Sequence, residues 1–218
     1  MKSAVLLPAM LLLAFPTTAG AADPIGDVTK VELSAFGTPP ADARREIFLG
    51  NTVVQDELVE TVIGGGASIT FIDGSQFHLG SGSQAALDAY VYNPGQGKGV
   101  VELGEGVFRF IGTSGGRHDL EVRTPDALIG VRGTDFVVIS SAGGKTVVGL
   151  ASGSVTVESR ATGDRGVPHP GQIATIDADD NVVVSDAPVK AGDLICWLSR
   201  DPYICRSGVA ETGAAPSS

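Results

Sequence analysis

One short segment of this chain has the residue pattern of the nucleophile motif of a serine hydrolase. Gly112-Thr113-Ser114-Gly115-Gly116 matches the form G-x-S-x-G, and His118 and Asp119 follow closely. That motif works because a strand turns sharply into a helix and exposes the serine hydroxyl. Here the apolar run from Val107 to Ile111 leads through glycines to another strand near Leu120. A hairpin loop is the favoured interpretation, and the sequence predicts no catalytic residue.

The residue types that ordinarily hold metal ions are scattered along the chain. Three histidines stand far apart, with no ligand-like partner two or four residues away: His78, His118 and His169. The acidic run from Asp177 to Asp180 lacks the glycine and the distal glutamate of a calcium loop. The sequence therefore predicts neither a metal nor a cofactor. A site assembled across separate strands is the alternative, and sequence spacing cannot test it.

Two tyrosines mark a candidate binding surface. Tyr90 and Tyr92 share one face of a strand-like segment beside the turn Asn93-Pro94-Gly95. Sugars and peptides often stack on aromatic rings placed this way. A half-buried strand edge has the same pattern, because aromatic residues are enriched in strands. Both interpretations stay open until exposure is known.

The two cysteines, Cys196 and Cys205, lie in the C-terminal segment. In an exported protein they would meet an oxidising compartment and form a disulfide that stabilises the fold by about 2–3 kcal/mol. The spacing also fits a pair of metal ligands. No histidine or further cysteine is near enough in sequence to complete a tetrahedral site, so the disulfide is favoured.

The segment from Arg123 to Phe136 has the most unusual pattern in the chain. Pro125 directs Thr124 toward extended geometry, so a strand that ends at Arg123 is interrupted before Ala127-Leu128-Ile129 resumes it. Gly130 and Gly133 then flank Arg132, and glycine within a strand marks a bulge or a close backbone approach.

Arg132 itself has two interpretations. A guanidinium among apolar residues is either buried and paired or presented to an anionic partner. Nearby carboxylates at Glu121, Asp126 and Asp135 favour the buried, structural role. On that interpretation, Arg132→Ala lowers the melting temperature by several degrees. Direct ligand binding by Arg132 is the alternative.

The elements that must position these residues are strands. Short β-branched or alternating runs recur from Val28 to Val184, separated by turn signals such as Asp73-Gly74, Gly143-Gly144 and Asp180-Asn181. The 30 glycines fit many turns. The sequence predicts an all-β domain with short strands and Gly-rich turns, built either as a β-helix-like roll or as a double sheet.

The first residues have the form of a secretory signal peptide. Lys2 supplies the charge, residues 4–15 the apolar region, and Ala19-Gly20-Ala21 a small-residue cleavage site. We expect a periplasmic or extracellular protein with no transmembrane segment in the mature chain. The net charge of −10 disfavours nucleic acid and anionic membranes as partners.

The chain resembles the FecR domain family. The motif Thr124-Pro125 followed by Ile129-Gly130-Val131-Arg132-Gly133-Thr134 carries the resemblance, and Asp73-Gly74-Ser75, Gly104-x-Gly106-Val107, Ser152-Gly153-Ser154 and Pro170-Gly171-Gln172 arrive in the family's order. The resemblance implies a non-enzymatic, all-β sensing or binding module that recognises an envelope protein or a cell-surface ligand. The family is named for a regulator of iron-citrate uptake.

The expected organisation departs from the best-known family architecture. A signal peptide (1–21) replaces the cytoplasmic anti-sigma segment and the membrane helix of that architecture. A FecR-like domain (25–187), a disulfide loop (188–206) and a disordered tail (207–218) follow, and this C-terminal region is too short for the family's smaller second domain. A link to sigma-factor control is therefore in question. An architectural envelope or matrix protein that self-associates is the alternative function.

The leader and the cysteines give a first prediction. Expression with export should yield a chain that begins at Ala22 and is lighter by two hydrogens than the chain with free thiols. Intact-mass spectrometry with and without reductant measures both. A product that keeps Met1 contradicts the cleavage site, and a mass unchanged by reduction contradicts the disulfide.

Overall fold

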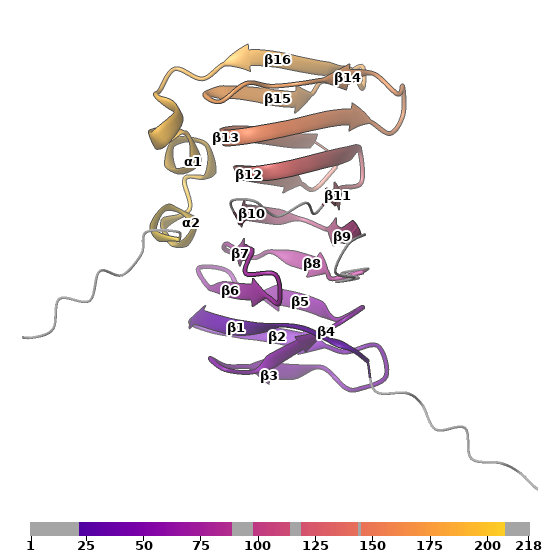
Figure 1. Cartoon of the computed structure of the whole chain (residues 1–218), viewed down its shortest axis with the longest axis vertical. Helices are drawn as coiled ribbons and strands as arrows, with labels where there is room; N and C mark the ends of the chain where they lie inside the picture. The colour runs from indigo at the N-terminus through magenta and orange to yellow at the C-terminus, as the bar shows by residue number, and fades with distance from the viewer. Residues whose placement is uncertain (1–21, 89–97, 114–118, 144, 208–218) are drawn as a thin grey trace, which may run out of the picture.

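The computed structural model describes residues 22–88, 98–113, 119–143 and 145–207. Strands make up 55% of the structure and helices 8%, so the predicted all-β class is confirmed. The strands are stacked from β3 and β4 at one end to β16 at the other, with two short helices along one side (Figure 1).

Within the described residues, sixteen strands form one continuous sheet that curls into two arms. The first arm contains β2 (Ala35–Thr38), β3 (Arg45–Ile47), β5 (Leu58–Thr61), β8 (Gln84–Ala86), β9 (Lys98–Leu103) and β11 (Asp119–Arg123). The second arm contains β1 (Pro24–Glu32), β4 (Thr52–Val54), β6 (Gly66–Phe71), β7 (Gln76–Leu79) and β10 (Gly106–Ile111). The two arms meet at β12 (Ala127–Ser141), which pairs with β11 along its first half and with β10 along its second.

The long hairpin of β12 and β13 (Lys145–Ser159) holds the two arms together. The two strands pair almost end to end, from Ala127 opposite Ser159 to Ser141 opposite Lys145, and the register breaks only around residues 132–136. Both strands therefore cross from one arm to the other at the same place. Three further strands extend the sheet beyond β13: β14 (Arg165–Gly166), β15 (Gln172–Ile176) and β16 (Val182–Asp186).

Two glycines make this bend. Gly133 has φ +58° and Gly153 has φ +89°, backbone conformations that residues other than glycine rarely adopt. A Cβ on Gly153 would lie 2.3 Å from the carbonyl oxygen of Gly133 and 2.6 Å from Cγ2 of Thr134. The two strands thus approach each other at the bend more closely than any side chain allows.

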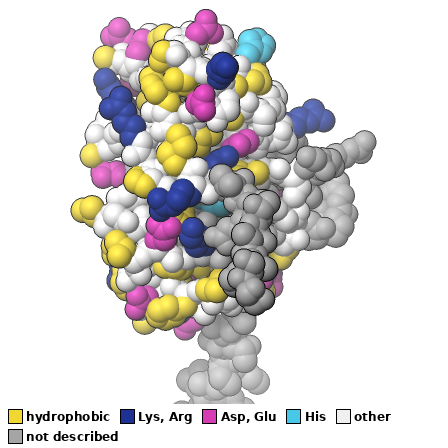
Figure 2. Space-filling view, turned by 90° about the vertical axis from the view of Figure 1, so that its left-hand side faces the viewer, with side chains coloured by type: hydrophobic (Ala, Val, Ile, Leu, Met, Phe, Trp, Pro, Cys, Tyr) yellow, Lys and Arg dark blue, Asp and Glu magenta, His cyan; other side chains and the backbone are white. Residues whose placement is uncertain are grey.

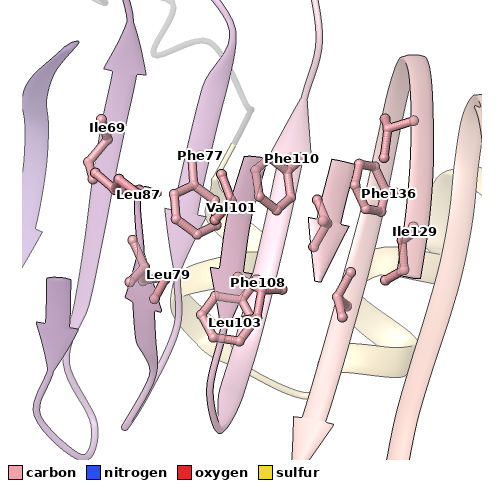
Figure 3. Packing of buried hydrophobic residues seen from close by; sticks show 14 of the residues in the cluster. Ile69, Phe77, Leu79, Leu87, Val101, Leu103, Phe108, Phe110, Ile129 and Phe136 are labelled. Carbon is pink, nitrogen blue, oxygen red and sulfur yellow. The ribbon is translucent and has the colours of Figure 1, made fainter. Parts of the chain in front are cut away.

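The core fills the space between the arms. A column of stacked phenylalanines runs through it, with ring centroids 4.3 Å apart for Phe77 and Phe110 and 5.2 Å apart for Phe110 and Phe136. Leu87, Val101, Leu103 and Ile129 of the first arm and β12 pack against these rings (Figure 3). This packing corresponds to the double-sheet form of the predicted fold, since one curled sheet supplies both layers.

The C-terminal residues pack back on the outer face of the second arm. Within the segment predicted as a disulfide loop (188–206), they form two helices, α1 (Ala191–Ser199) and α2 (Pro202–Arg206). Three glycines leave room for them: Gly66 in β6, Gly80 just after β7 and Gly149 in β13, where a Cβ would overlap Tyr203, Asp201 and Leu194, respectively. Of the helices in the described residues, none is long and apolar enough to span a bilayer.

The bend gives a second prediction. Gly153→Ala should lower the free energy of unfolding by roughly 2 kcal/mol or more, because it adds a Cβ at positive φ against the Gly133 carbonyl. Urea denaturation measures the change. Gly192→Ala in α1 is the matched control: its Cβ meets open space, and alanine should stabilise the helix by about 0.5–1 kcal/mol. A Gly153→Ala variant as stable as the parent would show that the bend does not depend on this glycine.

Candidate functional site

The Arg123–Phe136 segment serves two opposite edges of the fold. As expected, β11 ends at Arg123 and β12 begins at Ala127, with Thr124, Pro125 and Asp126 between them. The structure also shows what the sequence did not reveal: the strand that resumes at Ala127 is one bent strand that continues to Ser141. The Thr124–Asp126 connection lies at the edge where the hairpin turns, and Arg132–Thr134 lie at the bend on the other edge.

Asp126 closes the open edge between the two arms. Its Oδ1 accepts a hydrogen bond from Thr124 Oγ1 (2.9 Å), and its Oδ2 accepts one from the backbone N–H of Thr146 at the start of β13 (2.9 Å). The Thr146 hydroxyl also donates to Asp126 and lies 2.7 Å from that of Thr124. Thr124 and Thr146 are buried. The Thr-Pro half of the motif is therefore a polar latch between strands of different arms.

The apolar residues of the motif belong to the core. Ile129 is fully buried and Val131 nearly so, and Thr134 is buried at the bend against Gly153. Side chains alternate along β12, so residues 128, 130 and 132 face outward. The motif thus places Gly130 and Arg132 on the outer face of the first arm.

The predicted structural role of Arg132 is wrong. Its side chain is exposed, and within the described part of the chain no hydrogen bond or ion pair joins it to another residue. The carboxylates expected to pair with it have other partners. Asp126 belongs to the latch, and Glu121 accepts from Arg123 Nε at 2.6 Å. The predicted loss of stability in Arg132→Ala therefore has no structural basis.

Arg109 makes the structural ion pair that the sequence assigned to Arg132, and this pair is part-buried. Its Nε and Nη2 donate to Asp135 Oδ1 and Oδ2 at 2.9 and 2.8 Å, a two-point contact that fixes both planes. Its Nη1 also donates to the backbone carbonyls of Ile204 and Ser207 at the end of α2. The only signal for this role was the alternation in Val107-Phe108-Arg109-Phe110, which places Arg109 opposite the core face.

Gly130 occupies open space. A Cβ there would have no heavy atom within 4 Å, and the residue does not have a positive φ. Its register neighbours are Glu121 on β11 and Thr156 on β13, while Arg132 lies opposite Ser154. Nothing in the described fold therefore requires glycine at this position.

A buried polar cluster joins α2 to the second arm. Ser68 Oγ lies 2.6 Å from His78 Nδ1 and 2.6 Å from the Tyr203 hydroxyl. All three residues are at most 5% exposed, and no hydrogen-bond partner reaches His78 Nε2 in the described structure. Asp201 adds a second link, since it accepts from the backbone N–H of Tyr203 and, at 2.7 Å, from that of Ser81.

Burial sets the protonation of this cluster. Desolvation, together with the nearby positive charge of Arg109, lowers the pKa of His78 to about 4, against a smaller opposing effect of Asp135. Burial likewise raises the pKa of Tyr203 to about 12. His78 is therefore neutral at physiological pH. Exposed ion pairs border the cluster, such as Arg206 with Glu32 at 2.9 Å, on a face where basic and acidic side chains gather (Figure 2).

Of the remaining residues singled out in the sequence, the structure describes the two cysteines and His169 and does not describe the tyrosines or Ser114–His118. Cys196 in α1 and Cys205 in α2 have Cα atoms 4.7 Å apart, a separation compatible with the predicted disulfide. His169 is exposed in the connection between β14 and β15, whereas His78 is buried in β7. Tyr90, Tyr92 and the Ser114–His118 part of the hydrolase-like segment lie outside the described residues.

Comparison with known proteins identifies the family signature. Residues 57–156, from the start of β5 to near the end of β13, match the family model described as FecR protein. No curated protein matches the chain.

Two crystal structures of a candidate anti-sigma factor from Parabacteroides distasonis ATCC 8503 share the fold. One, at 2.50 Å resolution, has a TM-score of 0.54 at 20% identity, over 65% of this chain and 63% of that one. The other, at 1.65 Å, has a TM-score of 0.53 at 20% identity, over 65% and 64%. The chain thus spans less than two thirds of the length of these structures.

The latch gives a third prediction. Asp126→Ala should lower the free energy of unfolding by about 1–3 kcal/mol, because it removes the acceptor of two buried threonine hydroxyls. Thermal and urea unfolding measure the loss. Asp179→Ala, in an exposed turn, is the control and should change stability by less than about 0.5 kcal/mol. Equal stability of the two variants would contradict the latch.

The histidine gives a fourth prediction. Because the folded-state pKa of His78 is about 4, below the ordinary 6.5, its neutral form stabilises the fold fully above pH 6.5. That contribution, up to about 3 kcal/mol, is lost as the pH falls toward 4. Urea unfolding at a series of pH values should therefore show a smaller acid-side loss in His78→Gln than in the parent. His169→Gln, at an exposed histidine, should follow the parent, and parallel curves for His78→Gln would sink the assignment.

Proposed function

Because residues 57–156 of this chain match the FecR family model, we propose that it is a non-enzymatic sensing module that recognises a protein partner in the cell envelope. One observation carries the proposal. The family motif uses Thr124, Gly133 and Thr134 for the fold, yet leaves Arg132 on a sheet face that no described helix covers. An uncovered sheet face beside an unpaired cation is suited to recognition rather than to chemistry.

The structural neighbours support a regulatory partner. The Parabacteroides structures are described as a candidate anti-sigma factor, and their fold matches 65% of this chain. We extend to this chain only the general role, in which a β domain binds one protein and thereby signals to another. The capture experiment below identifies the protein that this chain binds.

The placement of the reactive side chains supports a non-enzymatic role. Ser68 and His78 come together as a serine and a histidine do in hydrolases, but both are buried beneath Tyr203 of α2. A substrate would have to displace the helix to reach them. Their hydrogen bonds join α2 to the sheet, which accounts for their burial in structural terms.

The export proposal rests on the chain's own chemistry. The leader-like first 21 residues precede the described domain. The two cysteines lie close enough for a disulfide, and disulfides form in oxidising compartments such as the periplasm. A periplasmic or extracellular location would place the uncovered face in contact with envelope proteins.

A second candidate function is self-association, and an apolar ridge favours it. The ridge consists of Phe48, Leu49, Leu33 and Ile63, which are 57%, 72%, 75% and 89% exposed. They lie where the chain crosses between arms at β3–β4, β1–β2 and β5–β6, next to the terminal strands of the sheet. Leu33 also adopts φ +57°, at a cost of about 1 kcal/mol that Gly64 at the next crossing avoids.

Affinity capture tests the first candidate. The exported protein, crosslinked in its native cells and purified, should bring down one envelope protein in a defined ratio by mass spectrometry. Recovery of the protein alone, or of cell-wall material without a partner, would overturn the sensing role.

Light scattering after size exclusion tests the second candidate. Self-association predicts a mass that rises with protein concentration in the parent and stays monomeric in Leu33→Asp/Ile63→Asp. Asp179→Ala is the surface control and should behave as the parent. A parent that is monomeric at all concentrations excludes the architectural role.

A further inference from the structure

We propose that the outer face of β12 at Gly130 and Arg132 is a binding site for a carboxylate side chain of a protein partner. Arg132 binds the carboxylate, and Gly130 lets the partner's backbone approach the strand. This inference rests on the proposed sensing function and names the site and the chemistry of recognition.

Gly130 is the first observation. Glycine inside a strand costs about 0.5–1 kcal/mol relative to alanine, so a strand glycine usually answers a steric need. Gly153 is required at the bend, and Gly66, Gly80 and Gly149 are required beneath the helices, because a Cβ at each position would overlap a neighbouring residue. No steric contact in the described fold requires glycine at position 130, since open space surrounds the position of the missing Cβ. The close approach of a partner's backbone would explain why this position carries glycine.

Arg132 is the second observation. Most described arginines reach an acceptor within the chain: Arg44, Arg45, Arg109, Arg123, Arg160, Arg165 and Arg206. Arg132 and Arg200 do not, among the residues with described side chains. Arg200 follows α1, away from this face. Arg132 is two residues from Gly130 on the same side of β12, about 7 Å away by strand geometry.

The surroundings favour a single carboxylate. Two-point hydrogen bonding is the usual contact between a guanidinium and a carboxylate, and Ser154 opposite Arg132 and Thr156 opposite Gly130 add hydroxyl donors. The chain carries a net charge of −10, and two acidic side chains lie near the site on the neighbouring strands: Glu121 of β11, opposite Gly130 and paired with Arg123, and Glu158 of β13, paired with Arg165. Polyanions such as nucleic acid or anionic lipid are repelled at long range, whereas one acidic side chain on a protein segment can bind at Arg132.

Stability measurements separate the site from the fold. Gly130→Thr should leave the melting temperature unchanged or raise it, because threonine suits a strand and the space is open. Arg132→Ala should also leave it unchanged, because the side chain has no described partner. A marked fall in the melting temperature of either variant would assign the residue to the fold and overturn the proposal.

Binding is tested by NMR titration of the ¹⁵N-labelled mature protein. The probe is a blocked extended peptide, acetyl-Thr-Val-Glu-Val-Thr-amide, compared with the same peptide carrying Gln in place of Glu. We expect the Glu peptide to shift the amides of Arg132, Gly133 and Ser154 at millimolar concentration, and the Gln peptide to bind at least about fivefold more weakly. Arg132→Ala and Gly130→Thr should each weaken the Glu peptide by a similar factor.

A matched variant completes the test. Arg165→Ala removes an exposed arginine that pairs with Glu158 and should leave peptide binding unchanged. The proposal fails if the Glu and Gln peptides bind equally, or if neither shifts these amides. It also fails if Arg132→Ala captures the envelope partner as well as the parent does, a result that would leave the sensing function intact; recovery of no partner by the parent would instead overturn the function.

Discussion

The structure depends on a backbone contact at which two long strands bend together. β12 and β13 each contain fifteen residues, and each must leave one arm of the sheet and enter the other without losing its partner. At the bend the missing Cβ of Gly153 would stand 2.3 Å from the Gly133 carbonyl oxygen, so the strands can stay paired only if that position carries no side chain. Everything that faces inward, from the phenylalanine column to Ile129, is brought together because the sheet folds at this point.

A curled sheet must also be closed where its arms separate, and polar groups do this. The Asp126–Thr124–Thr146 latch joins the start of β12 to the start of β13, across the core from the bend. Its two threonines are buried, so their hydrogen bonds replace hydrogen bonds to water, and the loss of the Asp126 acceptor would leave buried hydroxyls without it. Bend and latch lie at opposite edges, and both belong to one continuous motif in the sequence. This explains why so many unusual residue types are concentrated between Thr124 and Thr134.

The two outer faces of the curled sheet are treated differently. The second arm is covered by α1 and α2, which strand glycines accommodate and which Arg109, Ser68 and Asp201 tie down through hydrogen bonds. The first arm has no such cover in the described structure, and its charged residues are mostly satisfied among themselves, as Arg123 is by Glu121. Arg132 is the departure from that pattern. A sheet face that no described helix covers, and whose other charged side chains are mostly paired, is a surface on which a partner can be recognised.

The sequence by itself determined the class of fold, the break at Thr124-Pro125 and the need for glycine near residue 133, because alternation, proline and glycine act through local backbone geometry. Its motif also led to the FecR family, whose model matches residues 57–156. The sequence misassigned the arginines. Asp126 and Asp135 are near Arg132 along the chain, yet side-chain alternation and the bend send them elsewhere, and Asp135 meets Arg109 from a strand 26 residues away. The packing of α2 on Ser68, 135 residues distant, was likewise unreadable. Which side chains meet across strands depends on register and on the side to which the sheet curls, and only the tertiary structure decides both.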